Sequence, residues 1–216
     1  MTRESLREAV CARGVIAIVR LHDASKLVPA AEALYAGGIR VIEFTLNSPG
    51  ALNAITSSRH ALPKAIIGAG TVRSADDAKA ATDAGAQIIV APDTKPEVIE
   101  ATHAGQAAAI PGAYTPTEIA AAMDFGADLV KLFPAKGLGP GYVREVLAPL
   151  DDARLVPTGG VSVDNVTAYF AAGAAAVAVG GSLVNNALAD AGDFDAVTAN
   201  ARAIQEAVDA AHGKGT

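Results

Sequence analysis

The chain has 216 residues, of which 51% are hydrophobic and 19% charged, and its formal net charge is −6. This composition excludes a disordered chain, and the lack of a basic stripe with interleaved aromatic residues argues against nucleic acid as the main partner. The length is enough for one large domain with a substantial core, so we expect residues 1–216 to form a single domain.

The one cysteine, Cys11, cannot form an internal disulfide, which is typical of a protein in a reducing compartment. The N-terminal segment lacks the uninterrupted apolar core of a signal peptide. No apolar run is long enough to span a bilayer. These features predict a soluble, cytoplasmic protein that has no membrane partner.

Short apolar runs alternate with alanine-rich segments of helical character along the whole chain. The apolar runs lack a period of two, which is typical of parallel strands that are buried on both faces. Eight strands are predicted, over residues 15–20, 40–46, 65–70, 87–91, 107–111, 128–133, 154–158 and 175–179. The segments between and after them predict helices, over residues 24–36, 50–62, 75–84, 95–104, 117–125, 139–150, 163–172 and 193–211.

Eight strand–helix units in a chain of this length predict an α/β fold, a compact (β/α)8 TIM barrel. The alternative is a doubly wound open sheet. That fold usually has fewer strands and a glycine-rich first turn, and residues 19–22 do not form such a turn. The segment before the first strand predicts an extra N-terminal helix that covers the bottom of the barrel.

Two charged residues, Glu43 and Lys131, interrupt otherwise apolar strands. Burial lowers the pKa of a lysine and leaves part of it as a neutral amine, which is the nucleophile needed to attack a ketone. One alternative is that Lys131 reaches solvent from the end of its strand, and another is that it forms a structural ion pair with Glu43. A buried ion pair gains little stability after desolvation. We therefore favour a catalytic role for both residues, in which Lys131 forms a Schiff base and Glu43 is the general acid and base.

Glycine pairs follow the last two predicted strands, at Gly159-Gly160 and at Gly180-Gly181-Ser182. Backbone N–H groups at such positions form an anion site that commonly holds phosphate in this fold. Arg20 ends the first strand, which neighbours the last strand in a closed barrel, so it could add a charge-assisted contact. The four histidines are scattered without metal-ligand spacing, so no metal is expected.

Several motifs in order resemble those of the class I 2-keto-3-deoxy-6-phosphogluconate (KDPG) aldolases, a family that includes 4-hydroxy-2-oxoglutarate (KHG) aldolases. The resemblance runs from about residue 15 to 184, and its motifs are Glu43-Phe44-Thr45-Leu46, Gly68-Ala69-Gly70-Thr71-Val72, Pro111-Gly112, Lys131-Leu132-Phe133-Pro134 and Pro157-Thr158-Gly159-Gly160. It implies a lyase of the Entner–Doudoroff pathway of carbohydrate metabolism that cleaves KDPG to pyruvate and glyceraldehyde 3-phosphate. It also implies KHG as a second substrate, no cofactor, and a homotrimer.

The resemblance implies roles for residues at the matching positions. Lys131 matches the Schiff-base lysine, and Glu43 matches the general acid and base. The positions that bind substrate are Arg20, Thr45, Asn47, Thr71, Pro92, Phe133 and Thr158. The positions that bind its phosphate are Gly159, Gly160, Gly181 and Ser182.

One position departs from the family pattern, because Asn47 stands where many members carry an arginine that helps to hold the substrate carboxylate. Asn47-Ser48-Pro49 also resembles the branch that acts on the 6-phosphogalactonate epimer. The hydroxyl of Thr158 favours the gluconate epimer, because it can pair with a substrate hydroxyl. Two other interpretations remain open: another phosphate-binding barrel, such as a sugar-phosphate epimerase or isomerase, and a non-catalytic sensor of a phosphorylated acid.

Overall fold

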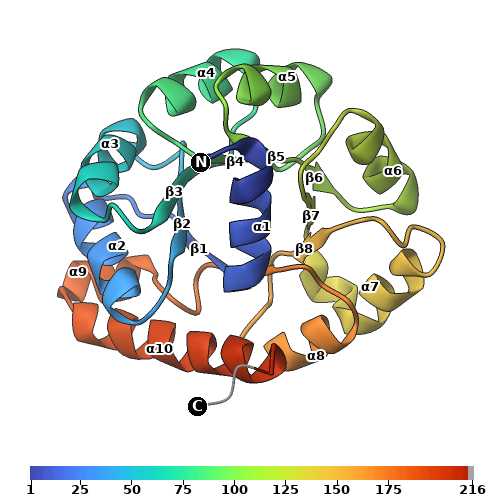
Figure 1. Ribbon diagram of the computed structural model, residues 1–216. Helices are drawn as coiled ribbons and strands as arrows, with labels where there is room; N and C mark the ends of the chain where they lie inside the picture. Colours follow the sequence, from blue (N-terminus) through green and yellow to red (C-terminus); the bar gives the residue numbers. More distant parts are fainter. Residues whose placement is uncertain (214–216) are drawn as a thin grey trace.

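Parallel strands form the centre of the molecule and helices surround them (Figure 1). The computed structural model describes residues 1–213. The last three residues of the predicted domain, 214–216, lie outside the described residues. The strands are β1 (Val15–Val19), β2 (Val41–Thr45), β3 (Ile66–Gly70), β4 (Ile88–Val90), β5 (Ala108–Ile110), β6 (Gly112–Ala113), β7 (Val130–Leu132), β8 (Leu155–Pro157) and β9 (Val177–Val179).

These strands form a six-stranded sheet in the order β5-β4-β3-β2-β1-β9 and a three-stranded sheet in the order β6-β7-β8. The predicted strand over residues 107–111 corresponds to β5, and β6 is an additional short strand beyond it. Pro111, which has no N–H to donate to a ladder, separates the two. The two sheets are connected at both edges. The amide of Lys131 donates to the Pro111 carbonyl at 2.8 Å, and Thr158 pairs with Ala178 in a parallel bridge. The chain is therefore an α/β protein whose parallel sheet curls around an interior.

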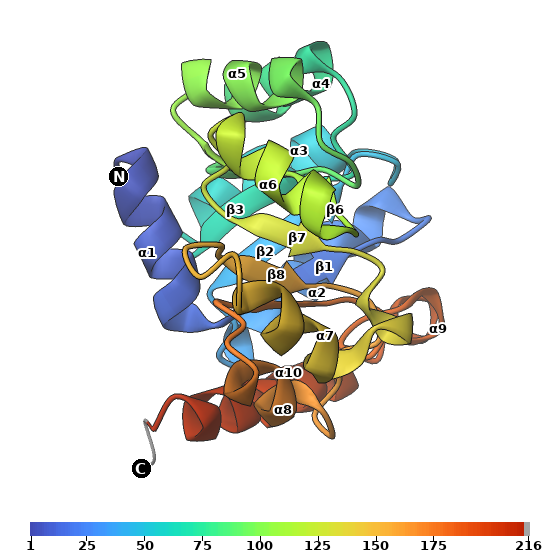
Figure 2. The same ribbon diagram turned by 90° about the vertical axis from the view of Figure 1, so that its right-hand side faces the viewer.

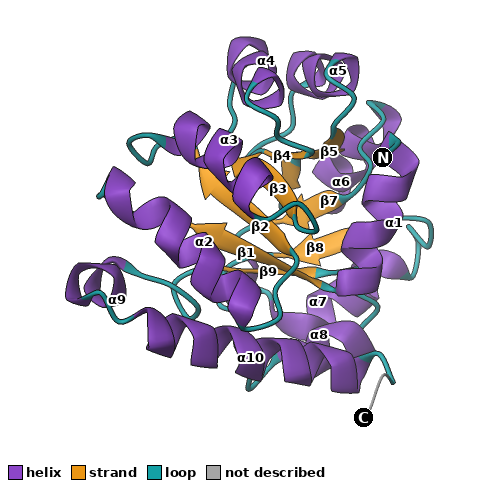
Figure 3. Ribbon diagram, turned by 60° about the vertical axis from the view of Figure 1, so that its left-hand side comes forward, coloured by secondary structure: helices purple, strands orange, loops and turns teal. Residues whose placement is uncertain are grey.

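Eight helices match the predicted helical segments and lie outside the strands (Figure 3). They are α2 (Leu27–Ala36), α3 (Ala51–Ala61), α4 (Ala75–Asp83), α5 (Pro96–Ala104), α6 (Pro116–Asp124), α7 (Gly139–Leu147), α8 (Val166–Ala171) and α10 (Phe194–Ala211). Some begin with a side-chain cap, as where the Ser74 hydroxyl accepts from the amide of Asp77. The predicted helix over residues 24–36 begins with a 3-10 turn, η1 (Ala24–Lys26), and continues as α2. The structure adds two short helices that the sequence analysis did not predict: η2 (Ala135–Gly137) and α9 (Asn186–Ala191).

Helix α1 (Arg3–Arg13) precedes β1 and lies across the amino ends of the strands. Its buried residues Leu6 and Val10 pack in one cluster with strand residues of the sheet interior, including Ile16, Val41 and Leu129. Figure 2 shows α1 at one end of the strands and α9 toward the other. The interior is therefore covered at the amino ends of the strands, and a binding site is expected at their carboxyl ends.

No helix within residues 1–213 combines the length and the apolar composition needed to cross a membrane.

Candidate active site

Glu43 on β2 and Lys131 on β7 lie inside the curled sheet. Val41 and Leu129, each two residues earlier in the chain, belong to the interior cluster, and alternation along extended backbone puts Glu43 and Lys131 on the same inner face. Glu43 is 1% exposed and Lys131 is 6% exposed. The two charged residues that interrupt the strands therefore both face the interior of the sheet.

Gly70 on β3 makes the space that the Glu43 carboxyl occupies. A Cβ at Gly70 would lie 2.5 Å from Oε1 of Glu43 and 2.8 Å from its Cδ. Any side chain larger than hydrogen would displace the carboxyl. A glycine is required at this position because the Glu43 carboxyl approaches the Gly70 backbone closely.

Glu43 and Lys131 do not form an ion pair in the part of the chain that the structure describes. No carboxylate oxygen lies within 4.0 Å of the Lys131 ammonium, and Oε2 of Glu43 is buried without a hydrogen-bond partner among residues 1–213. An unpaired buried carboxyl oxygen costs stability. The ion-pair alternative is therefore not the arrangement of these two groups.

Burial dominates the electrostatics of both groups. Desolvation raises the pKa of Glu43, while the positive charges of Lys131 and Arg20 oppose the rise. Desolvation lowers the pKa of Lys131; the Glu43 charge opposes this and the Arg20 charge adds to it. A carboxyl that holds its proton more firmly and a lysine that loses its proton more readily are suited to proton transfer and to nucleophilic attack.

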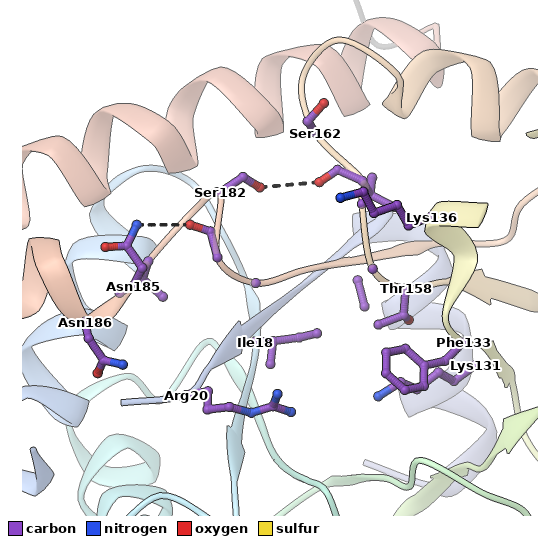
Figure 4. A pocket seen from close by; sticks show the side chains of 17 residues that line it. Ile18, Arg20, Lys131, Phe133, Lys136, Thr158, Ser162, Ser182, Asn185 and Asn186 are labelled. Carbon is purple, nitrogen blue, oxygen red and sulfur yellow. Dashed lines mark hydrogen bonds between the residues drawn. The ribbon is translucent and has the colours of Figure 1, made fainter. Parts of the chain in front are cut away.

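Arg20 follows β1 and extends toward Lys131 along the cavity (Figure 4). Its Nη2 donates to the Thr71 hydroxyl at 3.3 Å. Thr71 follows β3 and has a φ of 59°, a left-handed backbone that is uncommon for a branched residue. Arg20 is therefore directed toward the β2–β3 side of the site.

Phe133 and Thr158 contribute a ring and a hydroxyl to the same region. The ring of Phe133, which is 38% exposed, has its centroid 4.9 Å from Nζ of Lys131, a cation–π distance. Thr158 is buried, and its hydroxyl donates to the Val156 carbonyl at 3.0 Å. This hydroxyl can still accept a hydrogen bond from a ligand.

A cavity of about 570 Å³ opens at the carboxyl ends of β1, β7, β8 and β9 (Figure 4). Its lining includes Lys131 together with the four predicted phosphate-binding residues, Gly159, Gly160, Gly181 and Ser182. Gly159 and Gly160 have φ values of 93° and 78°, which favour glycine. Three cations and no carboxylate line the cavity, although the chain is acidic overall: Arg20, Lys131 and Lys136. This charge distribution suits an anionic ligand.

Four predicted substrate-binding residues, Thr45, Asn47, Thr71 and Pro92, do not line this cavity, and neither does the buried Glu43. The buried Thr45 hydroxyl lies 3.1 Å from the Ser48 hydroxyl and 3.4 Å from the Val19 carbonyl, where it holds the turn after β2. Asn47 is exposed in that turn. Pro92 lines a neighbouring cavity of about 430 Å³, which shares Phe133 with the first.

The sequence analysis did not select several residues that line the main cavity, including Lys136, Asn185 and Asn186. Their positions could have identified them, because loops that follow barrel strands commonly carry site residues. Asn185 caps α9 by accepting from the Leu188 amide, and Asn186 accepts from the His22 amide. Residues 1–213 contain no group of three or more His, Cys, Asp or Glu side chains that is positioned to hold a metal ion.

Comparison with known proteins places this geometry among aldolases. The family model described as "KDPG and KHG aldolase" matches residues 6–200. The chain is 36% identical over 194 residues to the KHG/KDPG aldolase of Escherichia coli (strain K12), covering 89% of this chain and 91% of that protein.

Two solved structures have the same fold. One is named "Native KDPGal structure"; it has a TM-score of 0.85 and 30% identity, covering 92% of this chain and 96% of the other. The other is the KDPG aldolase of Legionella pneumophila with pyruvate captured as a covalent carbinolamine intermediate. It has a TM-score of 0.85 and 26% identity, covering 94% of this chain and 98% of the other.

Proposed function

Because the chain belongs to the KDPG and KHG aldolase family, we propose that it cleaves KDPG to pyruvate and glyceraldehyde 3-phosphate through a Schiff base on Lys131. The protein is an aldehyde-lyase of class I. The observation that carries the residue assignment is the burial of Lys131 and Glu43 on one inner face without an ion pair between them. The captured pyruvate of the Legionella neighbour supports the same covalent chemistry.

The reaction begins when the neutral amine of Lys131 attacks C2 of the keto acid. Loss of water from the carbinolamine gives an iminium, which accepts electrons from the adjacent carbon chain. Glu43 takes the proton of the C4 hydroxyl, the C3–C4 bond breaks, and its electron pair forms an enamine with the iminium carbon. Glyceraldehyde 3-phosphate leaves as the aldehyde. Protonation of the enamine at C3 and hydrolysis of the imine then release pyruvate and free the lysine.

The site supports both the attack by the lysine and the proton transfer by the glutamate. The lowered pKa of Lys131 increases the fraction of free amine near neutral pH. The raised pKa of Glu43 lets this residue accept a proton in one step and return it in the next. The Phe133 ring lies beside the Lys131 ammonium, and both residues line the cavity.

We favour the gluconate epimer as substrate, with KHG as a second substrate. The Thr158 hydroxyl supports this preference, since it donates to the backbone and leaves its lone pairs available to a substrate hydroxyl in the cavity. The galactonate epimer is the second candidate. The structural neighbour named for KDPGal and the turn Asn47-Ser48-Pro49 favour it.

The remaining assignments rest on position and resemblance. Thr71 and Pro92 would contact the pyruvyl part, and Gly159, Gly160, Gly181 and Ser182 would hold the phosphate through their backbone N–H groups and one hydroxyl. Thr45 would act indirectly, because its hydrogen bonds support the turn that carries Asn47.

The proposal extends to the architecture of the chain. We infer that residues 1–216 form a single domain, a complete (β/α)8 barrel with α1 as its extra N-terminal helix. Support comes from the backbone connections at both sheet edges and from the packing of Leu6 and Val10 against interior residues.

We also propose a cytoplasmic homotrimer. Three exposed aromatic residues around the second cavity, Tyr114, Phe125 and Phe133, form an apolar surface that supports self-association. Light scattering of the purified protein tests the oligomeric state, and a monomeric mass would contradict it.

Borohydride reduction in the presence of pyruvate tests the covalent step. An aldolase of this mechanism becomes inactive and carries a carboxyethyl group on Lys131, which peptide mass spectrometry locates. A sugar-phosphate epimerase or a non-catalytic sensor would form no such adduct. An adduct on another lysine, or none, would contradict the assignment of Lys131.

A further inference from the structure

Two cations of the main cavity besides Lys131 lie on different walls. Figure 4 shows Lys136 on the side of Ser162 and Ser182, whereas Arg20 lies on the side of Ile18 and extends toward Lys131. The proposed substrate also has two anionic groups. Its carboxylate adjoins the keto carbon that Lys131 attacks, and its phosphate lies at the other end of the six-carbon chain.

Lys136 is held beside the glycine turn after β8. The Ala135 amide donates to the Thr158 carbonyl at 2.8 Å, which ties η2 to the end of that strand. A Cβ built on Gly160 would lie 2.8 Å from Cβ and 2.9 Å from Cγ of Lys136. The stem of Lys136 therefore packs directly on the turn whose N–H groups are expected to meet the phosphate.

The ammonium of Lys136 has no ion pair or hydrogen bond to residues 1–213. It is exposed at the rim of the cavity, and its three donors are available to a ligand. No carboxylate lines the same cavity to neutralise it.

Arg20 lies at the other end of the site, near Thr71 and the two proposed catalytic residues. Its guanidinium donates to Thr71, across β2, and its charge acts on the pKa of both Glu43 and Lys131. The charge of Lys136 is not among those that act on either group. Arg20 is thus the cation beside the reacting carbon, and Lys136 is the cation beside the glycine turn.

We propose that Lys136 is the cationic residue that binds the substrate phosphate, and that Arg20 binds the carboxylate at the keto-acid end. This assignment rests on the proposed aldolase function and refines it, because it reverses the sequence-based expectation that Arg20 contacts phosphate. Asn47, which lies outside the cavity lining, leaves Arg20 as the charged partner for the carboxylate.

The test compares Lys136→Met and Arg20→Met with a matched control, Lys64→Met. Lys64 lines a separate cavity with α1 residues, and its replacement removes the same charge far from the reaction. The assay measures kcat/KM for KDPG and for KHG, which lacks phosphate, and the inhibition of KDPG cleavage by inorganic phosphate. Pyruvate trapping by borohydride in each variant reports on the Schiff base separately.

For Lys136→Met we expect kcat/KM to fall roughly ten- to a hundred-fold more for KDPG than for KHG, the loss typical of one charge-assisted contact. Inhibition by inorganic phosphate should weaken about ten-fold or more, and Lys136→Arg should restore it. For Arg20→Met both substrates should lose by similar factors, and phosphate inhibition should persist.

Equal losses on both substrates in Lys136→Met, or losses no larger than those of Lys64→Met, would overturn the proposal. So would loss of phosphate inhibition in Arg20→Met with retention in Lys136→Met. A parent enzyme that traps no pyruvate would instead contradict the aldolase function itself, so the two failures are distinguishable.

Discussion

Two buried carboxylates, Asp128 before β7 and Glu43 on β2, have different surroundings in the fold. Asp128 accepts from the Ala109 amide at 2.8 Å and lies 3.1 Å from both Arg3 Nε and His103 Nε2. In contrast, Oε2 of Glu43 has no hydrogen-bond partner in residues 1–213. A buried carboxylate with hydrogen-bond and ion-pair partners stabilises the fold. A buried carboxyl group without partners destabilises it, and its shifted pKa is typical of groups that transfer protons.

The difference extends to the surroundings of each carboxylate. Around Asp128, helix α1 covers the interior with Leu6 and Val10. Near Glu43, Lys131 lines an open cavity whose cations have no carboxylate partner in its lining. The comparison predicts that changes near Glu43 affect chemistry more than folding, and that changes near Asp128 do the reverse.

The largest expected effect follows replacement of Lys131 by arginine. Lys131→Arg keeps the positive charge but cannot form an imine, so cleavage of KDPG should fall by several orders of magnitude, as loss of a covalent step does. Steady-state kinetics measures the loss, and circular dichroism serves as the folding control. Near-normal cleavage by a folded Lys131→Arg protein would remove the Schiff base from the mechanism.

Glu43→Gln should cost less, roughly 10²–10⁴-fold in kcat, which is the range for a general acid and base. The variant should still trap pyruvate with borohydride, because the nucleophile remains. Exchange of the methyl protons of pyruvate with deuterated solvent, followed by NMR, should slow with cleavage.

The stability of Glu43→Gln has a predictable pH dependence. Since the folded pKa of Glu43 is raised above its unfolded value, its contribution to stability is present at low pH and is lost as pH rises through the folded pKa. In denaturant unfolding, the free energy of unfolding of Glu43→Gln should therefore increase relative to that of the parent protein as pH rises above the ordinary carboxyl range. Unchanged proton exchange together with a pH-independent stability difference would contradict the role given to Glu43.

Asp128→Asn should give the opposite result to Glu43→Gln. Removal of this charge weakens the contacts to Arg3, His103 and the Ala109 amide, so the free energy of unfolding should fall by about 1–3 kcal/mol. We expect kcat per folded molecule to change little, since Asp128 lies at the covered end of the sheet. A large loss of kcat with unchanged stability would break the contrast between the two carboxylates.

Much of this arrangement was predictable from local sequence. Buried parallel strands are continuous apolar runs, and every predicted strand is present in the structure. A single glutamate or lysine within such a run is conspicuous in the sequence, which is how Glu43 and Lys131 were identified. The short strand β6 was missed because the apolar run ends at Pro111, and the glycine and alanine that follow it are depleted in strands. Helix α9 was missed because six residues carry little periodicity, and its cap at Asn185 is a single side chain.

The arrangement of the charges was not predictable, because it depends on contacts between distant elements. Glu43 and Lys131 lie on β2 and β7, which belong to different sheets and are not neighbouring strands. The direction of Arg20 depends on Thr71, which lies 51 residues away in the chain. The position of Lys136 depends on η2 and on its packing against Gly160.

The smallest expected effect is a change in pH dependence and not in mechanism. The rate of pyruvate trapping requires neutral Lys131, so it should rise with pH through a pKa that lies below the ordinary lysine value. Arg20 contributes to this lowering, because its like charge disfavours the ammonium. Arg20→Met removes that charge and should shift the rise of the trapping rate to higher pH, while Lys136→Met should leave it in place.

Saturating pyruvate keeps this measurement independent of the weaker carboxylate binding that Arg20→Met is also expected to cause. Trapping rates at each pH should give profiles of the same shape for the three proteins, with the parent and Lys136→Met at the same position and Arg20→Met at higher pH. A shift to lower pH in Arg20→Met would contradict the sign of the charge effect. An equal shift in Lys136→Met would mean that both cations act on Lys131, so the cavity would not be divided into a reacting end and a phosphate end.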